Sequence, residues 1–132
     1  MKNTILLIED ESVLINMYRE IFDRHSEFEL LTAENKVDGI QAIRKYQPKV
    51  ILLDLIIPEK PGGMVAYDKR VGFDLLREVK QTPVFGKVRF FIFSNIDTHE
   101  DRQTSDELGV QEYLLKADYT PIALIKKLEK YT

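Results

Sequence analysis

Six polar side chains that can act together on a phosphate group follow four separate apolar runs of the chain. In chain order they are Glu9, Asp10, Glu11, Asp54, Ser94 and Lys116. Carboxylates gathered at one place repel one another unless a hard cation neutralises them. Mg²⁺, which takes oxygen ligands, waters and phosphates, is the natural cation for such a cluster. If these side chains meet in space, they therefore predict a magnesium site.

Asp54 is the best candidate for a nucleophile in this set. It closes a fully apolar run, Val50–Leu53, so its carboxylate is expected to be rigidly positioned. Phosphoryl transfer asks a protein mainly to position groups and to stabilise charge on the phosphoryl oxygens, which suits the Lys116 ammonium and the Ser94 hydroxyl. Each residue alone is more simply explained as a turn, a cap or a solvated charge. Only their joint occurrence at the ends of apolar runs predicts phosphoryl chemistry.

The elements that must position these residues alternate regularly along the chain. Apolar runs of strand length are expected as strands at 4–8, 29–33, 49–54, 88–93 and 112–115. Segments with helical spacing are expected as helices at 12–25, 35–46, about 72–81, 98–108 and from 120 to the C-terminal region. This alternation predicts an α/β fold with a parallel sheet and helices on both of its faces. Ligands of such a sheet bind at the carboxyl ends of its strands, where the polar set lies.

Local patterns also predict how the helices begin and which side faces the core. N-caps are expected at Ser12, Asn35 and Thr120. Apolar residues expected to face inward near the starts of their helices are Val13, Val37 and Ile122.

Size and composition limit the kinds of protein that this can be. The 132 residues suffice for one domain, expected over 1–132, and the start methionine with the terminal helix favours a free-standing chain. A net charge of −3 argues against direct nucleic-acid binding. No apolar run is long enough to span a membrane, and the absence of cysteine fits a reducing compartment, so a cytoplasmic location is expected.

Four short segments give the chain a resemblance to a known family. They are IEDES at 8–12, LDLIIP at 53–58, FS at 93–94 and YLLK at 113–116. With these segments the chain resembles, from its first strand to its last helix, the receiver domains of two-component response regulators. That resemblance implies a flavodoxin-like, doubly wound sheet of five parallel strands in the order 2-1-3-4-5.

The resemblance also implies a role for each site residue. The Mg²⁺ ligands would be Glu9, Asp10, Asp54 and the backbone carbonyl of Ile56. Asp54 would accept a phosphoryl group from a histidine kinase or a histidine phosphotransfer protein, with Lys116 and Ser94 contacting the phosphate. The chain would then be a phosphoacceptor switch, and its only catalytic activity would be its own phosphorylation and dephosphorylation.

A conformational switch follows from the same resemblance. Phosphate on Asp54 would draw in the Ser94 hydroxyl and open space for Tyr113 to rotate inward. This movement would remodel the surface of the fourth helix, fifth strand and fifth helix, and a downstream protein target would read that surface.

The segment at 58–71 departs from the family pattern. The glycine that usually follows the family's proline closely is here Gly72, fourteen positions after Pro58. The sequence therefore predicts an insertion between the third strand and the third helix, lying over the site. Its candidates for contact with phosphate, kinase or a partner receiver are Lys60, Tyr67, Lys69 and Arg70, although a plain solvated loop is the simpler interpretation.

Two further departures bear on the lifetime of the phosphorylated form. Ile56 is apolar where many relatives carry a polar residue, and Asn95 stands where a small residue is commoner. Both are expected to obstruct attacking water, which predicts slow self-dephosphorylation. Glu9, where relatives often carry aspartate, still supplies an oxygen ligand.

Four other interpretations remain open at this point. A pseudo-receiver that no longer accepts phosphate is disfavoured by the intact Asp54, Ser94 and Lys116. An FMN protein would need a phosphate-binding first loop rich in glycine and hydroxyls, whereas this one is acidic. An aspartyl-phosphate phosphatase would need a second aspartate two places after Asp54, where Ile56 stands. A domain cut from a longer hybrid kinase or regulator is also possible.

Overall fold

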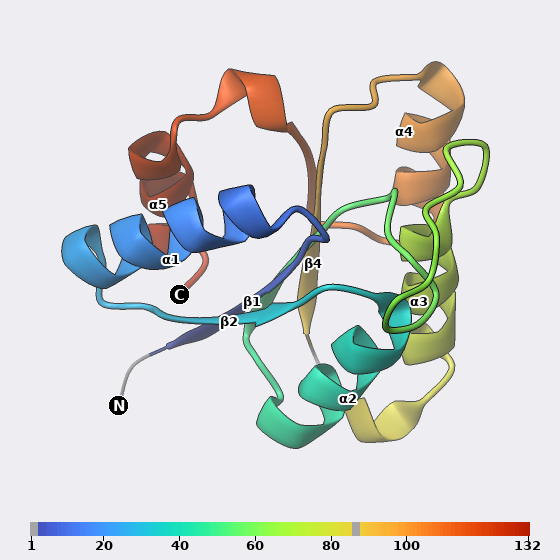
Figure 1. Ribbon diagram of the computed structural model, residues 1–132, viewed down its shortest axis with the longest axis horizontal. Coiled ribbons are helices and arrows are strands. Elements are labelled where there is room, and N and C mark those ends of the chain that lie inside the picture. The colour runs from blue at the N-terminus through green and yellow to red at the C-terminus, as the bar shows by residue number, and fades with distance from the viewer. Residues whose placement is uncertain (1–2, 86–87) are drawn as a thin grey trace.

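The computed structural model describes residues 3–85 and 88–132, which form a sheet of five strands with helices on both faces (Figure 1). The strands are β1 (Thr4–Ile8), β2 (Glu29–Ala33), β3 (Val50–Leu53), β4 (Arg89–Ser94) and β5 (Glu112–Leu115). The helices are α1 (Ser12–His25), α2 (Lys36–Tyr46), α3 (Val71–Lys80), α4 (His99–Glu107) and α5 (Pro121–Glu129). Two short 3₁₀ turns, η1 (Pro83–Phe85) and η2 (Lys116–Asp118), complete the elements.

The sheet has the predicted topology. Its strand order is β2-β1-β3-β4-β5, and every neighbouring pair is parallel. In Figure 1, α1 and α5 cover one face, and α2, α3 and α4 lie on the other. The core is accordingly divided in two, with one cluster under α1 and α5 and another under α2 and α3. The expected flavodoxin-like α/β fold is confirmed.

The register of the central strands brings the site residues to one edge. Ile8 at the end of β1 pairs with Leu53 at the end of β3, and Leu53 pairs with Ile92 in β4. Ser94 at the end of β4 pairs with Leu115 of β5. The residues that follow these strands therefore emerge side by side, and the backbone N–H of Asp54 donates to the carbonyl of Ile8 at 3.1 Å.

Two of the three predicted N-caps are confirmed. The Asn35 side chain accepts from the N–H of Asp38 at 2.8 Å, and the Thr120 hydroxyl accepts from the N–H of Ala123 at 3.1 Å. The prediction for Ser12 is wrong, because Ser12 is already the first helical residue. The preceding Glu11 occupies the cap position with an extended backbone and makes no side-chain capping bond.

Three residues predicted to face inward are instead exposed. The relative solvent exposure of Val13 is 78%, and that of Val37 and Ile122 is 42% and 40%. Each is the second residue of its helix. Their burial begins only further along, at residues such as Ile15, Ile43 and Leu124. Each of the three stands two positions before the first buried residue of its helix, and residues two positions apart do not share a helix face.

Gly72 allows the start of α3 to lie directly against the backbone of Asp54. Its N–H donates to the carbonyl of Leu55 at 3.1 Å. A Cβ at this position would lie 2.4 Å from the carbonyl oxygen of Asp54 and 2.9 Å from the Cα of Leu55. Because both of these are backbone atoms, they cannot give way without moving Asp54 itself.

Replacing Gly72 with alanine should therefore destabilise the fold, and replacing Gly39 should not. A Cβ at Gly39 of α2 would meet only the ends of the Ile8 and Leu75 side chains, each at 3.0 Å, and these can shift. Both substitutions gain helix propensity, so their difference isolates the backbone clash. Gly72→Ala is expected to lower the free energy of unfolding by about 1–3 kcal/mol relative to Gly39→Ala, measured by urea denaturation. Equal stabilities would contradict the close approach.

Candidate functional site

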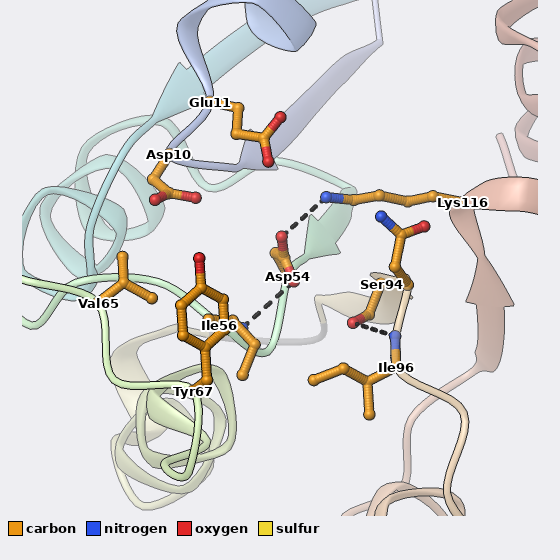
Figure 2. A pocket seen from close by; sticks show the side chains of 10 residues that line it. Asp10, Glu11, Asp54, Ile56, Val65, Tyr67, Ser94, Ile96 and Lys116 are labelled. Carbon is orange, nitrogen blue, oxygen red and sulfur yellow. Dashed lines mark hydrogen bonds and ion pairs between the residues drawn. The ribbon is translucent and has the colours of Figure 1, made fainter.

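A pocket of about 160 Å³ opens at the carboxyl ends of the strands. Figure 2 shows that side chains from several elements face it: Asp10 after β1, Asp54 after β3, Ser94 at the end of β4 and Lys116 after β5. The four ends of apolar runs that the sequence singled out thus meet at one place, as the parallel register requires.

The Lys116 ammonium is the central contact of this pocket. Its Nζ donates to Oδ2 of Asp54 at 2.8 Å and also to the carboxylate of Glu9. All three side chains are buried at their charged ends. Burial by itself lowers the pKa of Lys116, but the charges of Asp54 and Glu9 outweigh it, so the pKa lies above its ordinary value. Lys116 is therefore a fixed positive charge beside Asp54.

One ammonium does not balance the acids that surround it. Glu9, Asp10 and Asp54 each offer a carboxylate oxygen within 4.8 Å of the other two. Burial, together with the charge of Asp54, raises the pKa of Glu9 to about 7 against the opposing effect of Lys116. Burial and the charge of Asp54 also raise the pKa of Asp10. The raised pKa values record chiefly the cost of burying these charges, to which the neighbouring charge of Asp54 adds.

This cluster fits a divalent cation. Its donors are hard carboxylate oxygens, and they carry more negative charge than Lys116 neutralises. Glu9 and Asp54 are buried, whereas Asp10 is half-buried and reaches the pocket. The backbone of Ile56 lies next to the cluster, because its N–H donates to Oδ1 of Asp54 at 3.2 Å. Coordination of Mg²⁺ by the backbone carbonyl of Ile56 stays a prediction.

Ser94 and the apolar residues beside it form the opposite wall. The Ser94 side chain is buried, and its Oγ accepts from the N–H of Ile96 at 3.2 Å (Figure 2). Ile56, Asn95 and Ile96 also line the pocket. Obstruction of water by Ile56 and Asn95, and the slow dephosphorylation expected from it, stays a prediction.

Tyr113 belongs to β5 and lies behind this wall, with its ring beside α4. Its hydroxyl donates to the carbonyl of Ile96 at 2.5 Å, and the guanidinium of Arg102 lies 4.8 Å from its ring centre. Burial, together with the nearby charge of Asp101, raises the pKa of Tyr113 to about 12. The residue is half-buried, with its hydroxyl at the segment that follows Ser94.

The inserted segment contributes only part of what the sequence suggested. Tyr67 lines the pocket, together with Val65, which sequence reasoning had missed. Lys60 and Lys69 are exposed. Arg70 instead binds Asp101 at the start of α4, and the contact joins residues 31 positions apart. Sequence reasoning also missed Asp101, although the Thr98-x-x-Asp101 spacing of a capping box was a signal for it.

The family can now be stated from comparison with known proteins. The model of the response regulator receiver domain matches residues 5–129 of the chain. The chain belongs to this family. Receiver domains act in two-component systems, are typically phosphorylated on an aspartate, and bind Mg²⁺ in an acidic pocket. The resemblance found in the sequence is therefore confirmed, and the acidic cluster of this receiver domain corresponds to the family's Mg²⁺ site.

Curated relatives align with this receiver domain over part of their length. The transcriptional regulatory protein CitB of Klebsiella pneumoniae is 30% identical over 115 residues, which are 86% of this chain and 44% of that protein. The chemotaxis protein CheY of Halobacterium salinarum is 32% identical over 63 residues, which are 47% of this chain and 51% of that protein. The matches thus cover about half the length of these relatives.

Solved structures agree with the fold. The chemotaxis protein CheY4 of Vibrio cholerae superposes with a TM-score of 0.81 at 17% identity, covering 100% of both chains. The receiver domain of a sensor histidine kinase from Pseudomonas aeruginosa PAO1 gives 0.78 at 17% identity, covering 99% of this chain and 98% of that one. That structure has a magnesium ion coordinated in its active-site cleft.

Within residues 3–85 and 88–132, no helix combines the length and apolar character needed to cross a membrane.

Neutralising one acid of the cluster should stabilise the metal-free domain and weaken its response to Mg²⁺. Asp10→Asn is expected to raise the free energy of unfolding in EDTA by about 0.5 kcal/mol, a small gain because solvent screens a half-exposed charge. It should also reduce the rise in melting temperature that Mg²⁺ gives the unaltered protein, because ligand stabilisation scales with affinity. Thermal denaturation with MgCl₂ or EDTA measures both effects.

Glu27→Gln is the matched control, because Glu27 is exposed in the turn between α1 and β2, at the other edge of the sheet. It removes the same charge without touching the cluster. A Mg²⁺ response that is as large in Asp10→Asn as in Glu27→Gln would contradict a metal site at Asp10.

Proposed function

We propose that this receiver domain is a switch that is activated when Asp54 accepts a phosphoryl group from the histidine of a histidine kinase or a histidine phosphotransfer protein. The observation that carries the proposal is the setting of the Asp54 carboxylate. One of its oxygens accepts from the N–H of Ile56, and the other is paired with the Lys116 ammonium. The carboxylate thus lies in the pocket, already oriented, beside a cluster that suits Mg²⁺.

In the proposed reaction a carboxylate oxygen of Asp54 forms a bond to phosphorus while the bond from phosphorus to the histidine nitrogen breaks. The electron pair of that bond stays on the nitrogen. Lys116 and Ser94 stabilise the negative charge on the phosphoryl oxygens, and their place in the pocket that Asp54 lines supports these roles. This self-modification and its reversal by water are the only chemistry that we assign to the domain.

Glu9, Asp10, Asp54 and the carbonyl of Ile56 are the proposed ligands of Mg²⁺. The bound ion would neutralise charge on the acids and on the phosphoryl oxygens. The crowding of the three carboxylates supports this assignment, because the single ammonium of Lys116 does not balance three negative charges.

The proposed switch connects Ser94, beside Asp54 in the pocket, to Tyr113 through a single residue, Ile96. The N–H of Ile96 donates to the Ser94 hydroxyl, and the carbonyl of Ile96 accepts from the Tyr113 hydroxyl. If Ser94 turns towards a phosphate on Asp54, the segment carrying Ile96 loses one of its ties and Tyr113 loses its fixed acceptor. Tyr113 is then free to rotate inward and to change the surface of α4, β5 and α5.

The output that we propose is protein–protein interaction. A downstream protein would bind the altered surface of α4, β5 and α5, and the net charge of −3 supports a role without direct contact to nucleic acid. We take residues 1–132 as one receiver domain, and its free-standing and cytoplasmic character stays a prediction from the sequence. A pseudo-receiver is the alternative that phosphate uptake decides.

The first test of the proposed function is the mass of the intact protein after incubation with acetyl phosphate. One added phosphoryl group is expected with Mg²⁺, and at least a tenfold smaller fraction is expected in EDTA, since positioning and charge stabilisation supply most of the catalysis. Asp54→Asn should give no adduct. Asp106→Asn, at an exposed aspartate of α4, should behave as the unaltered protein. An adduct that survives in Asp54→Asn would place the modification elsewhere, and no adduct at all would favour the pseudo-receiver.

The second test separates phosphorylation from the switch. Ser94→Ala is expected to accept phosphate on Asp54, severalfold more slowly, but to show much smaller amide chemical-shift changes in α4, β5 and α5. The reason is that Ile96 then lacks the hydroxyl that links it to the phosphate. Ser26→Ala, which removes a serine hydroxyl after α1 at the opposite edge, is the control. Full shift changes in phosphorylated Ser94→Ala would refute the connection through Ser94.

A further inference from the structure

The inserted segment, residues 58–70, is an arch whose first end is tied to α2 (Figure 1). The carbonyl of Pro58 accepts from the N–H of Lys36 at 2.9 Å, and the carbonyl of Glu59 accepts from the N–H of Val37 at 3.1 Å. These N–H groups belong to the first turn of α2 and have no partner within the helix. The arch therefore begins with bonds that the helix itself needs.

The other end of the arch is tied to α4 by Arg70. The Nε of Arg70 lies 3.1 and 3.2 Å from the two carboxylate oxygens of Asp101, a residue that is only 5% exposed. Asp101 also accepts from the Thr98 hydroxyl at 2.8 Å. The Nη1 of Arg70 donates back to the carbonyl of Tyr67 at 2.8 Å. One arginine thus joins the arch to α4 and at the same time fixes the backbone of Tyr67.

Between its two ends the arch places Tyr67 at the mouth of the Asp54 pocket. Backbone bonds from Gly63 to Lys60 at 2.9 Å and from Lys69 to Ala66 at 3.1 Å close two turns on either side. Figure 2 shows the Tyr67 ring beside Ile56, with its hydroxyl end directed towards the side of the pocket that holds Asp10 and Asp54. The arch is thus built to hold one aromatic ring over the site.

The exposure of Tyr67 argues against a role in folding. Its side chain is 79% exposed, so it buries little surface and contributes little packing energy. A ring held at a pocket mouth by backbone ties, yet barely packed, is suited to restricting access instead.

We propose that Tyr67 restricts the approach of water to phosphorylated Asp54 and so prolongs the phosphorylated state. This inference rests on the proposed function. In the step that it slows, a water oxygen forms a bond to phosphorus and the bond from phosphorus to the Asp54 oxygen breaks. The electron pair returns to the Asp54 carboxylate, and a proton of the water passes to solvent as inorganic phosphate leaves. The ring acts by occupying the side of the pocket through which water would enter.

The lifetime of the phosphorylated full chain tests this role. The protein is phosphorylated with acetyl phosphate and Mg²⁺, the donor is removed by desalting, and the loss of the adduct is followed by intact mass. Tyr67→Ala is expected to shorten the half-life by roughly tenfold, while its melting temperature stays unchanged because the side chain packs so little. Tyr67→Phe keeps the ring and should keep the long half-life.

Two further variants test the arch itself. Met64→Ala changes a side chain of the same segment that is 93% exposed and does not line the pocket, and it should leave the half-life unchanged. Arg70→Gln removes the ion pair with Asp101 and should shorten the half-life in the same direction as Tyr67→Ala, although Tyr67 is still present.

Each remaining outcome is decisive. An adduct that decays equally fast in the unaltered protein and in Tyr67→Ala overturns the inference and leaves the proposed function intact. A Tyr67→Phe protein that decays as fast as Tyr67→Ala overturns the role of the ring and assigns the effect to the hydroxyl. A chain that takes up no phosphoryl group overturns the proposed function, and this inference with it.

Discussion

Lys116 donates to two buried carboxylates that belong to different strands, and the arrangement of the site depends on this contact. Glu9 follows β1 and Asp54 follows β3, so the ammonium after β5 joins three of the five strand ends. Withdrawing a partner from such a buried charge pair is strongly destabilising, because the remaining charge is left uncompensated. The contact nevertheless leaves an excess of negative charge, since Glu9, Asp54 and Asp10 share one ammonium. The same interaction that orients Asp54 thus creates the demand for a cation.

The parallel register explains why so many residues of this site could be predicted from the sequence. In a parallel sheet each strand end reaches the same edge, so Asp54, Ser94 and Lys116 were bound to meet once their strands were recognised. The fold class was predictable for the same reason, whereas the strand order was implied by the resemblance of four short segments to receiver domains. Each apolar run marked a strand, and each polar residue directly after it marked the edge.

Other features were not predictable, because they depend on contacts between distant parts of the chain. Val13, Val37 and Ile122 are apolar, yet they are exposed because the side of each helix that faces the sheet is set by packing. Arg70 was a candidate for contact with phosphate, but it binds Asp101, and no local pattern relates these two residues. The placement of Val65 and Tyr67 at the pocket likewise depends on ties to α2 and α4, which only the folded chain reveals.

The close approach of Gly72 to the backbone of Asp54 makes the position of Asp54 independent of the arch, although the two are adjacent in sequence. Because α3 begins against Asp54 and Leu55, the geometry of the phosphoacceptor is set by residues that lie outside the arch. Changes in the length of the arch between Pro61 and Met64, which do not line the pocket, can then be absorbed away from the chemistry. This stretch is accordingly a suitable place to splice in a reporter peptide or a fluorescent label, which would sense the site without being part of it.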